Sequence, residues 1–428
     1  MQFNTRCLQA GYEPGNGDPR QIPIYQNVTW YFDSSEHQAR IFNLEEGGYF
    51  YSRLSNPTND AVAARIAALE GGSAAVLTAS GQTASFFSVF NICQAGDHLV
   101  AVSQIYGGTY NLFAITLPKM GIEVTFVDAD APLEELQKAI RPNTKCVFGE
   151  TLANPSLKVL DIEKFATLAH DAGVPLIVDN TFPTPFNCRP FEHGADIVVH
   201  STTKYLDGHA SALGGVVVDS GNFDWAAQGD KFPGLTQPDP SYHGLVFTDT
   251  FGQAGAYVTK IVTSLMRDLG AITTPQNAFL LGMNIESLPV RMERHISNAQ
   301  EIAEWLDAHD SVKKVYFPGL AGDSQHELAR KYFDFAGGSG VISFDLCGSR
   351  EDATTFLDAL NVARIATHVA DARTCVLHPA STTHRQLSDE QIIEAGVSPT
   401  MVRISVGIED VRDLIADLDE ALKTAFPS

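Results

Sequence analysis

The sequence predicts an α/β protein with a mostly parallel seven-stranded sheet and a smaller C-terminal α+β domain. Seven short apolar runs lie between residues 74 and 219, and most of them alternate with helix-like segments. Several runs are almost entirely apolar, which is typical of strands buried on both faces of a parallel sheet. The chain of 428 residues also exceeds the size at which a single core usually stops growing. A second, smaller domain is therefore expected.

The first 60 residues are expected to form an arm that packs on a neighbouring subunit. Up to about Asn56 the chain contains glycine, proline and aromatic residues without a clear period. Disorder is the alternative, and the aromatic residues disfavour it. From Pro57 to Leu69 small and aliphatic residues recur at helical spacing, with Asn56 to Thr58 as a start signal and Gly71-Gly72 as a stop.

Residues 61–270 are expected to form the domain that contains the large sheet. Its short apolar runs, separated by helical segments, indicate strands of a parallel α/β sheet. The predicted strands are Ala74–Thr78, His98–Val102, Glu123–Val127, Lys145–Gly149, Pro175–Asp179, Ile197–His200 and Leu213–Asp219. Their order in the sheet does not follow from the sequence.

Residues 271–428 are expected to form the smaller domain, because the pattern changes past about residue 270. A long helical stretch runs from about Ile285 to His309, and a last helix is predicted over Asp410–Ala425, whose apolar residues lie near one helical face. The strand candidates between these helices are Lys313–Phe317, Gly340–Leu346 and Val402–Val406.

The composition limits the expected partners and location. The formal charge of −22 disfavours nucleic acid, because phosphates would be repelled. The six cysteines form no Cys-x-x-Cys pair and no charged-then-apolar signal segment opens the chain, which favours a reduced cytoplasm. The longest apolar stretches fall far short of the ~20 residues that cross a bilayer. A membrane partner is therefore not expected.

A short polar turn follows the first predicted strand. Ser80, Gly81 and Gln82 lie between this strand and a helical stretch from Thr83. The carboxyl edge of an open α/β sheet is where ligands bind, and free N–H groups at a helix start favour a phosphate. An ordinary tight strand-to-helix turn would look the same, so this motif alone is weak.

An aspartate and a lysine follow two later strands. Asp179 ends an apolar strand, where a carboxylate would keep the nitrogen of a bound pyridine ring protonated. Considered alone, Asp179 is more simply a helix N-cap or turn residue. Lys204 follows Ser201, Thr202 and Thr203, and a lysine that forms a Schiff base with an aldehyde needs a partly desolvated site with anion-binding hydroxyls nearby. Considered alone, an exposed lysine after a strand is the simpler interpretation.

Together the three motifs predict a pyridoxal phosphate site, since they supply a phosphate cradle, an acidic ring partner and an amine. Val178-Asp179-Asn180 with Ser201-Thr202-Thr203-Lys204 resembles the cofactor signature of the Cys/Met metabolism family of pyridoxal-phosphate enzymes. The resemblance covers essentially the whole chain. It implies the aspartate aminotransferase fold, fold type I, with Lys204 joined to the cofactor and with Ser201 and Thr203 near its phosphate.

The resemblance also implies three aromatic and basic cofactor contacts. Tyr106, within Tyr106-Gly107-Gly108-Thr109-Tyr110, would stack on the cofactor ring, and a core aromatic is the alternative role. Tyr51 and Arg53 resemble the pair that reaches the cofactor phosphate of a neighbouring subunit, since an arginine fork suits phosphate. The chain would then be a homo-oligomer of at least two copies, and the family is usually tetrameric.

Arg403 and Asn154 are the candidates for substrate binding. Arg403 lies between apolar neighbours in a predicted strand, and such an arginine requires a carboxylate. The resemblance implies that this carboxylate is the α-carboxylate of an amino acid substrate, while a structural ion pair is the competing role. Asn154 would by similarity lie near the cofactor oxygen and the same carboxylate.

Three further segments resemble the O-acetylhomoserine sulfhydrylase branch of the family: Gly149–Pro155, Pro238–Gly244 and His378–His384. This branch implies γ-replacement on O-acetyl-L-homoserine by sulfide or a small thiol, giving L-homocysteine or L-methionine and acetate, with Lys204 as the proton shuttle. Cystathionine γ-synthase, O-succinylhomoserine sulfhydrylase and methionine γ-lyase remain alternatives on the same scaffold. His368 and Ala370 depart from the usual Asn or Ser and Gly, and Asp207 is less typical of the sulfhydrylases.

Two other classes of protein are alternatives to a pyridoxal phosphate enzyme. A nicotinamide-dependent dehydrogenase would also show alternating α/β elements, but no Gly-x-Gly-x-x-Gly follows the early strands. A non-catalytic binding homologue predicts a missing lysine, whereas Lys204 and Asp179 are both present.

Overall fold

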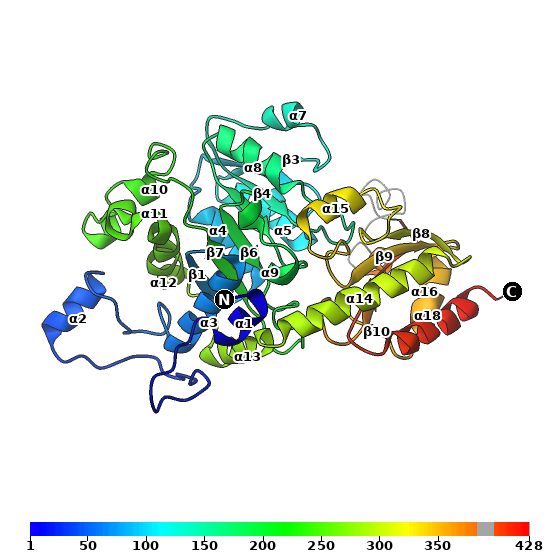
Figure 1. Ribbon diagram of the computed structural model, residues 1–428. Coiled ribbons are helices and arrows are strands. Elements are labelled where there is room, and N and C mark those ends of the chain that lie inside the picture. The colour runs from blue at the N-terminus through cyan, green and yellow to red at the C-terminus, as the bar shows by residue number, and fades with distance from the viewer. Residues whose placement is uncertain (383–397, 428) are drawn as a thin grey trace.

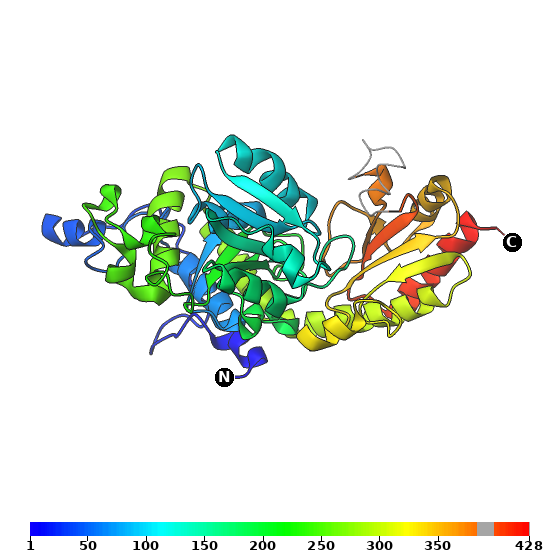
Figure 2. The ribbon, with the colours of Figure 1, turned by 90° about the horizontal axis from the view of Figure 1, so that it is seen from above.

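The computed structural model describes residues 1–382 and 398–427. It contains a seven-stranded sheet in the middle of the molecule and a five-stranded sheet toward the end that carries the C-terminus (Figures 1 and 2). The long helix α14 (Leu288–Asp307) runs from one sheet to the other along one side. None of the helices in these two ranges is long and apolar enough to cross a membrane.

The large sheet confirms the prediction of seven mostly parallel strands. Its order is β1-β7-β6-β5-β4-β2-β3, and strands β2 to β6 run parallel while β7 is antiparallel to both β1 and β6. The central strands are fully buried, which explains their nearly continuous apolar sequences. The bounds are β1 Ala74–Thr78, β2 His98–Val102, β3 Glu123–Val127, β4 Thr144–Glu150, β5 Leu176–Asp179, β6 Ile197–His200 and β7 Gly215–Asp219.

Helix α3 (Pro57–Glu70) shows the predicted start and stop. The Asn56 side chain accepts a hydrogen bond from the Thr58 N–H, and Gly71 ends the helix with a φ of 82°. The other helices of this part of the chain are α4 Gly81–Phe90, α5 Gly107–Asn111, α6 Leu117–Lys119, α7 Leu133–Gln137, α8 Ile162–Asp171, α9 Thr184–Asn187, α10 Pro233–Thr236, α11 Phe247–Lys260 and α12 Arg267–Leu269.

The small sheet has two strands that the sequence did not indicate. Its order is β10-β11-β12-β9-β8, with β10 parallel to β11 and the other pairs antiparallel. The predicted strands are confirmed as β8 Val312–Tyr316, β9 Val341–Leu346 and β12 Met401–Ser405. The two additional strands, β10 Arg364–Ile365 and β11 Cys375–Leu377, are too short to form a recognisable apolar run.

The helices of the C-terminal part follow the predicted pattern with one difference. The expected long helix is α14, and it is preceded by a separate helix α13 (Pro275–Ile285). The last helix is α18 (Val411–Ala425), and Asp410 caps it by accepting from the Arg412 N–H. The other α-helices among the described residues of this part are α15 His326–Tyr332 and α16 Arg350–Ala359.

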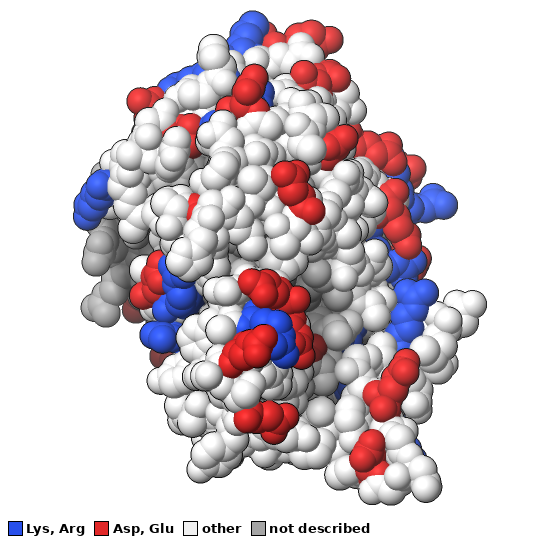
Figure 3. All heavy atoms as spheres, turned by 90° about the vertical axis from the view of Figure 1, so that its left-hand side faces the viewer, with Lys and Arg blue, Asp and Glu red and all other residues white. Residues whose placement is uncertain are grey.

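The N-terminal arm is poorly covered by the rest of the chain. It contains α1 (Phe3–Gln9) and α2 (Ser35–Phe42), and α2 stands at the left edge of Figure 1. Apolar and aromatic side chains of this segment are exposed, with Val28 at 58% and Tyr31 at 104% of the maximum. Viewed from that side, the surface carries charged side chains in scattered groups, with broad uncharged areas between them (Figure 3). Helix α1 packs on α3 and buries Cys7, whereas Val28 and Tyr31 are left uncovered by their own chain.

Candidate active site

Most of the predicted site residues meet in one cavity of about 280 Å³ between the two sheets. The large sheet contributes the ends of β4, β5 and β6 and the turn after β1, and the small sheet contributes β12. Tyr51 and Arg53 are absent from its lining. The predicted residues that do line it are Ser80, Gly81, Gln82, Tyr106, Asn154, Asp179, Ser201, Thr203, Lys204 and Arg403.

One end of the cavity is formed by the start of helix α4. The Ser80 hydroxyl accepts from the Thr83 N–H at 3.2 Å, and the first N–H groups of the helix, those of Gly81 and Gln82, have no partner within it. A Cβ added at Gly81 would lie 2.5 Å from the Cβ of Ser201, so only glycine allows this close approach. The free N–H groups and the helix dipole make this end suitable for a phosphate.

The hydroxyl groups after β6 differ in their availability. Thr203 Oγ1 donates to the Gly214 carbonyl at 3.2 Å and accepts from the Gly214 N–H at 3.1 Å, which fixes the loop before β7. The Ser201 N–H donates to Thr181 Oγ1 at 2.9 Å. Ser201 therefore has the less engaged hydroxyl at this end of the cavity.

Asp179 lies at the end of β5 with one oxygen engaged. Its Oδ1 accepts from the N–H and the hydroxyl of Thr181, while its Oδ2 receives no donor from the described part of the chain. Burial raises the pKa of the carboxyl above its ordinary value, although the Thr181 donors oppose the shift. A cationic ring nitrogen would supply the charge and the donor that Oδ2 lacks, so Asp179 fits the predicted pyridine ring.

Glu150 is a cavity residue to which the sequence argument gave no role. It ends β4 directly opposite Asp179 in the sheet, and its Oε2 accepts from the Tyr106 N–H at 2.6 Å. Burial, together with the nearby charge of Asp179, raises the pKa of Glu150 well above its usual range. Its position as the last residue of a buried strand was the available signal. Glu150 therefore holds the start of α5, and Tyr106 with it, at the cavity.

Lys204 carries the amine of the site. Its Nζ lies 3.4 Å from Nδ1 of His368, and no carboxylate in residues 1–382 or 398–427 forms an ion pair with it. Burial, and then the charge of Arg403, lower the pKa of the amine. A neutral amine is the form that attacks an aldehyde or removes a proton.

Arg403 on β12 is a buried cation without a carboxylate partner in the described residues. Nη1 donates to Asn154 Oδ1 at 3.0 Å, and Nη2 donates to the His368 carbonyl at 3.2 Å. Its buried Nε has no partner there. Because an uncompensated buried guanidinium is costly, this arrangement favours a carboxylate ligand over the alternative of a structural ion pair.

The three departures from the family pattern have different structural roles. Ala370 has a φ of 68°, a left-handed conformation that favours glycine, and its N–H donates to Ser405 Oγ at 2.7 Å. Asp207 is fully buried and accepts from Ser211 and Asn284 in a turn outside the cavity lining, so its role is structural. His368 contacts Lys204 directly.

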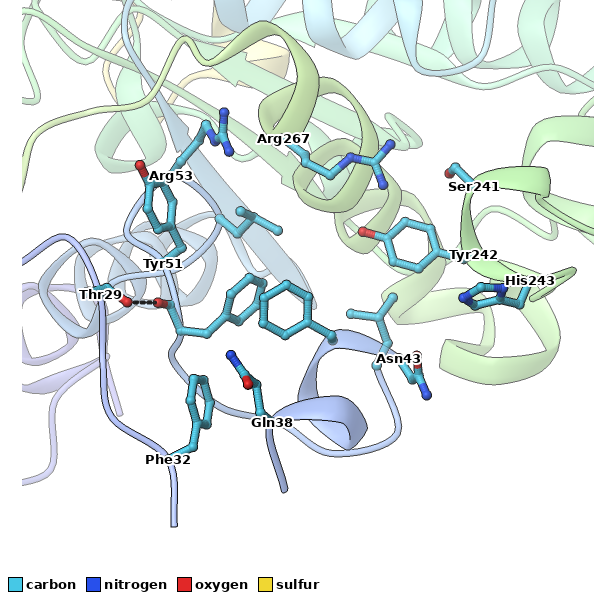
Figure 4. Close-up of a pocket in the computed structure, with 14 residues that line it drawn as sticks. Thr29, Phe32, Gln38, Asn43, Tyr51, Arg53, Ser241, Tyr242, His243 and Arg267 are labelled. Atoms are coloured by element: carbon cyan, nitrogen blue, oxygen red, sulfur yellow. Dashed lines mark hydrogen bonds between the residues drawn. The ribbon is translucent and has the colours of Figure 1, made fainter. Parts of the chain in front are cut away.

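Tyr51 and Arg53 lie in a second cavity of about 480 Å³, between the arm and the segment around α12 (Figure 4). The Arg53 guanidinium lies 5.2 Å from the centre of the Tyr51 ring, and Arg267 lies at the same distance from Tyr242. Tyr242 belongs to the segment Pro238–Gly244, which resembled the sulfhydrylase branch. One chain therefore does not bring Tyr51 and Arg53 to Lys204.

Part of a third resembling segment can be placed. His378 is buried and contacts Ser381 and the Pro399 carbonyl through its two ring nitrogens. Thr383 and His384 lie outside the described residues. Within those residues, no group of His, Cys, Asp and Glu side chains is arranged to hold a metal ion.

The fold and the cavity define a class of protein. A mostly parallel sheet presents an amine of lowered pKa, a buried carboxylate and a helix start to one cavity, and a second sheet adds an arginine. This combination is what a lysine-tethered pyridoxal phosphate enzyme of fold type I requires.

The comparison with known proteins gives the family. The model of the Cys/Met metabolism PLP-dependent enzymes matches residues 4–423, and the chain belongs to this family. It is 44% identical to the O-acetyl-L-homoserine sulfhydrylase of Leptospira meyeri, over 98% of this chain and 96% of that protein. It is 46% identical to the homocysteine synthase of Schizosaccharomyces pombe, over 99% and 98%.

A solved structure shows the same fold. The crystal structure described as an O-acetylhomoserine (thiol)-lyase of Campylobacter jejuni has a TM-score of 0.94 and 39% identity, over 99% of this chain and 100% of that one. It carries a pyridoxyl-lysine monophosphate. The predicted fold type I, the family and the pyridoxal phosphate cofactor are thereby confirmed.

Proposed function

We propose that the enzyme replaces the acetate group of O-acetyl-L-homoserine with sulfide or a small thiol, giving L-homocysteine or L-methionine and acetate. The observation that carries this proposal is the buried guanidinium of Arg403, which faces the Lys204 cavity and lacks a carboxylate partner in the described residues. The relatives named as O-acetyl-L-homoserine sulfhydrylase and homocysteine synthase, at 44% and 46% identity, support the choice of substrate.

The roles of the residues follow from their positions. Arg403 and Asn154 bind the α-carboxylate of the substrate through the guanidinium fork and the side-chain amide. Lys204 removes the Cα proton, because its lowered pKa makes the neutral amine accessible. Pyridoxal phosphate, when bound, accepts the negative charge that forms at this carbon. Asp179 would keep the ring nitrogen of the cofactor protonated, since its Oδ2 is an acceptor without a donor in the described residues.

The other cavity residues hold the cofactor. The Gly81 and Gln82 N–H groups, with the Ser80 and Ser201 hydroxyls, bind its phosphate at the start of α4. Thr203 shapes this end through Gly214. Tyr106, half-exposed and anchored by Glu150, stacks on the ring.

We also infer that two copies of the chain share each site. Tyr51 and Arg53 lie outside the Lys204 cavity of their own chain, on an arm with exposed aromatic side chains. Arginine suits a phosphate by charge and geometry. In this proposal the chain consists of an arm (1–60), a cofactor domain (61–270) and a C-terminal domain (271–428). The enzyme is at least a dimer, and a tetramer in the family's usual form. We propose that it is located in the cytoplasm. All six cysteines are described and unpaired, which supports that location.

A product assay tests the reaction. Purified holoenzyme is given the acetyl, succinyl or phospho ester of homoserine with sulfide, and homocysteine, 2-oxobutanoate and ammonia are measured. The proposal predicts homocysteine as the main product, with the acetyl ester turned over fastest. A preference for the succinyl ester, or 2-oxobutanoate and ammonia as the main products, would contradict it and favour a sister activity.

A further inference from the structure

His368 is tied to both functional cations of the site. Its Nδ1 lies 3.4 Å from Lys204 Nζ, although the two residues are far apart in the sequence. Its main-chain carbonyl accepts from Arg403 Nη2 at 3.2 Å and from Cys375 Sγ at 3.2 Å. These contacts fix the loop between β10 and β11, so the imidazole is held at the amine by a backbone that is itself bound to the arginine.

Burial and the neighbouring cations favour the neutral form of the His368 ring. Burial and the charge of Lys204 lower the pKa of the imidazole, and Arg403 acts in the same direction. Asp371 and Asp207 oppose the shift without reversing it. A neutral ring has one acceptor nitrogen, and the contact with the Lys204 amine assigns that role to Nδ1. The proton is then on Nε2, which is buried and has no partner among the described side chains.

We propose that His368 is a positioning residue for Lys204, which accepts a hydrogen bond from the lysine nitrogen and holds it toward the reacting carbon. No proton passes to the imidazole in this role. The proposal rests on the proposed function for the importance of Lys204, and it adds a residue at a position where the family pattern has Asn or Ser. An asparagine could supply a similar acceptor without titrating near neutral pH.

The role has a defined pH dependence. A neutral imidazole is the functional form, and protonation would turn its acceptor nitrogen into a donor that faces another cation. Because Lys204, Arg403 and burial lower the pKa, the loss of function falls below the ordinary histidine value of about 6.5. At higher pH the imidazole is neutral and its contact with Lys204 is intact. His368→Asn should therefore remove this acid-side loss, whereas His368→Leu should remove the contact at every pH.

The test compares the wild-type holoenzyme with His368→Asn and His368→Leu in two measurements. The first is kcat and KM from pH 5 to 9. The second is the pH titration of the visible absorption band of the cofactor, which needs no substrate and reports the protonation of the Lys204 nitrogen. His368→Leu is expected to lower kcat about 3- to 10-fold with KM nearly unchanged, as loss of one hydrogen bond implies. It should also move the band titration to lower pH by about 0.5–1 unit.

His368→Asn is the matched control. It should keep kcat within about 2-fold of the wild type at pH 8, as a retained hydrogen bond implies, and its kcat should fall less at acid pH. An unchanged band titration in His368→Leu, or a His368→Asn variant as impaired as His368→Leu, would overturn the proposal. A wild-type enzyme that makes no homocysteine would refute the proposed function alone, because the band titration would still report the contact between His368 and Lys204.

Discussion

The Lys204 cavity and the Arg53 cavity show two ways of building one site. The first lies at the ends of buried strands, where Asp179 and Glu150 are placed opposite each other by the sheet register. The second lies on an arm whose Tyr51 is 40% exposed. The reactive groups are therefore positioned within one chain, whereas the proposed phosphate-binding pair lies at the surface of the arm. The site would then be complete only when two chains associate.

Replacing the amine of the first cavity should have the largest effect. Lys204→Ala removes both the proposed attachment point of the cofactor and the proposed base, so activity should fall by more than about 10⁴-fold and the visible absorption band should shift. Lys204→Arg keeps a cation but has no primary amine, and it should be equally inactive. Turnover assays and absorption spectra of the purified variants measure this. A Lys204→Ala enzyme with full turnover would refute the role of the lysine.

Arg403→Leu should act on substrate binding in the same cavity. In its proposed role the buried guanidinium binds the charged carboxylate of the substrate, and loss of those hydrogen bonds should raise KM about 100-fold. Arg403→Lys keeps the charge without the planar fork, so its KM should lie between that of the wild type and that of Arg403→Leu. Steady-state kinetics with O-acetyl-L-homoserine provide the measurement. Unchanged kcat and KM in Arg403→Leu would show that another group holds the carboxylate.

Arg53→Ala should remove only the phosphate contact that is proposed for the second cavity. Because this guanidinium is exposed, its loss should lower cofactor affinity by only about 10-fold, and Arg20→Ala, at another exposed arginine of the arm, should have no effect. Cofactor titration measures this change.

Mixing subunits tests whether the two cavities belong to different chains. A hybrid of Lys204→Ala and Arg53→Ala subunits should regain activity at physiological cofactor levels, since one of its shared sites would have both residues intact. If each chain completed its own site, every site in the hybrid would carry one defect. No recovery would therefore contradict the shared site.

The sequence predicted the buried strands best, and the reason is physical. Strands such as β2 and β6 are buried on both faces, so their residues are almost all apolar. Both residues of β10, Arg364 and Ile365, are exposed, and no hydrophobic pattern marks them. The position of β7 between β1 and β6 depends on tertiary packing, which periodicity does not encode.

The site shows the same limit. Lys204 and Asp179 were predictable because Asp179 ends one strand and Lys204 follows the next, and ligands bind at that edge of the sheet. The contact between His368 and Lys204 joins the two sheets, and no local pattern could reveal it. Glu150 also ends a buried strand at this edge, but no local pattern indicates which group it contacts. Its partner, the Tyr106 N–H, belongs to another crossover.

The smallest expected effect concerns backbone strain beside the first cavity. Ala370→Gly should raise the free energy of unfolding by about 0.5–1 kcal/mol, because glycine adopts the left-handed conformation without a Cβ clash. Ala366→Gly, in the same loop at a residue without positive φ, should instead lower it by about 0.5–1 kcal/mol. Chemical denaturation of both variants checks the difference in sign. A destabilised Ala370→Gly variant would show that the alanine side chain is needed there.

Borohydride reduction of the holoenzyme shows whether Lys204 is the residue that binds the cofactor covalently. Reduction makes the link between cofactor and lysine permanent, and peptide mapping by mass spectrometry then locates the pyridoxyl group. We expect the label on Lys204 in the peptide that contains Ser201 and Thr203. A label on another lysine, or no label, would contradict it.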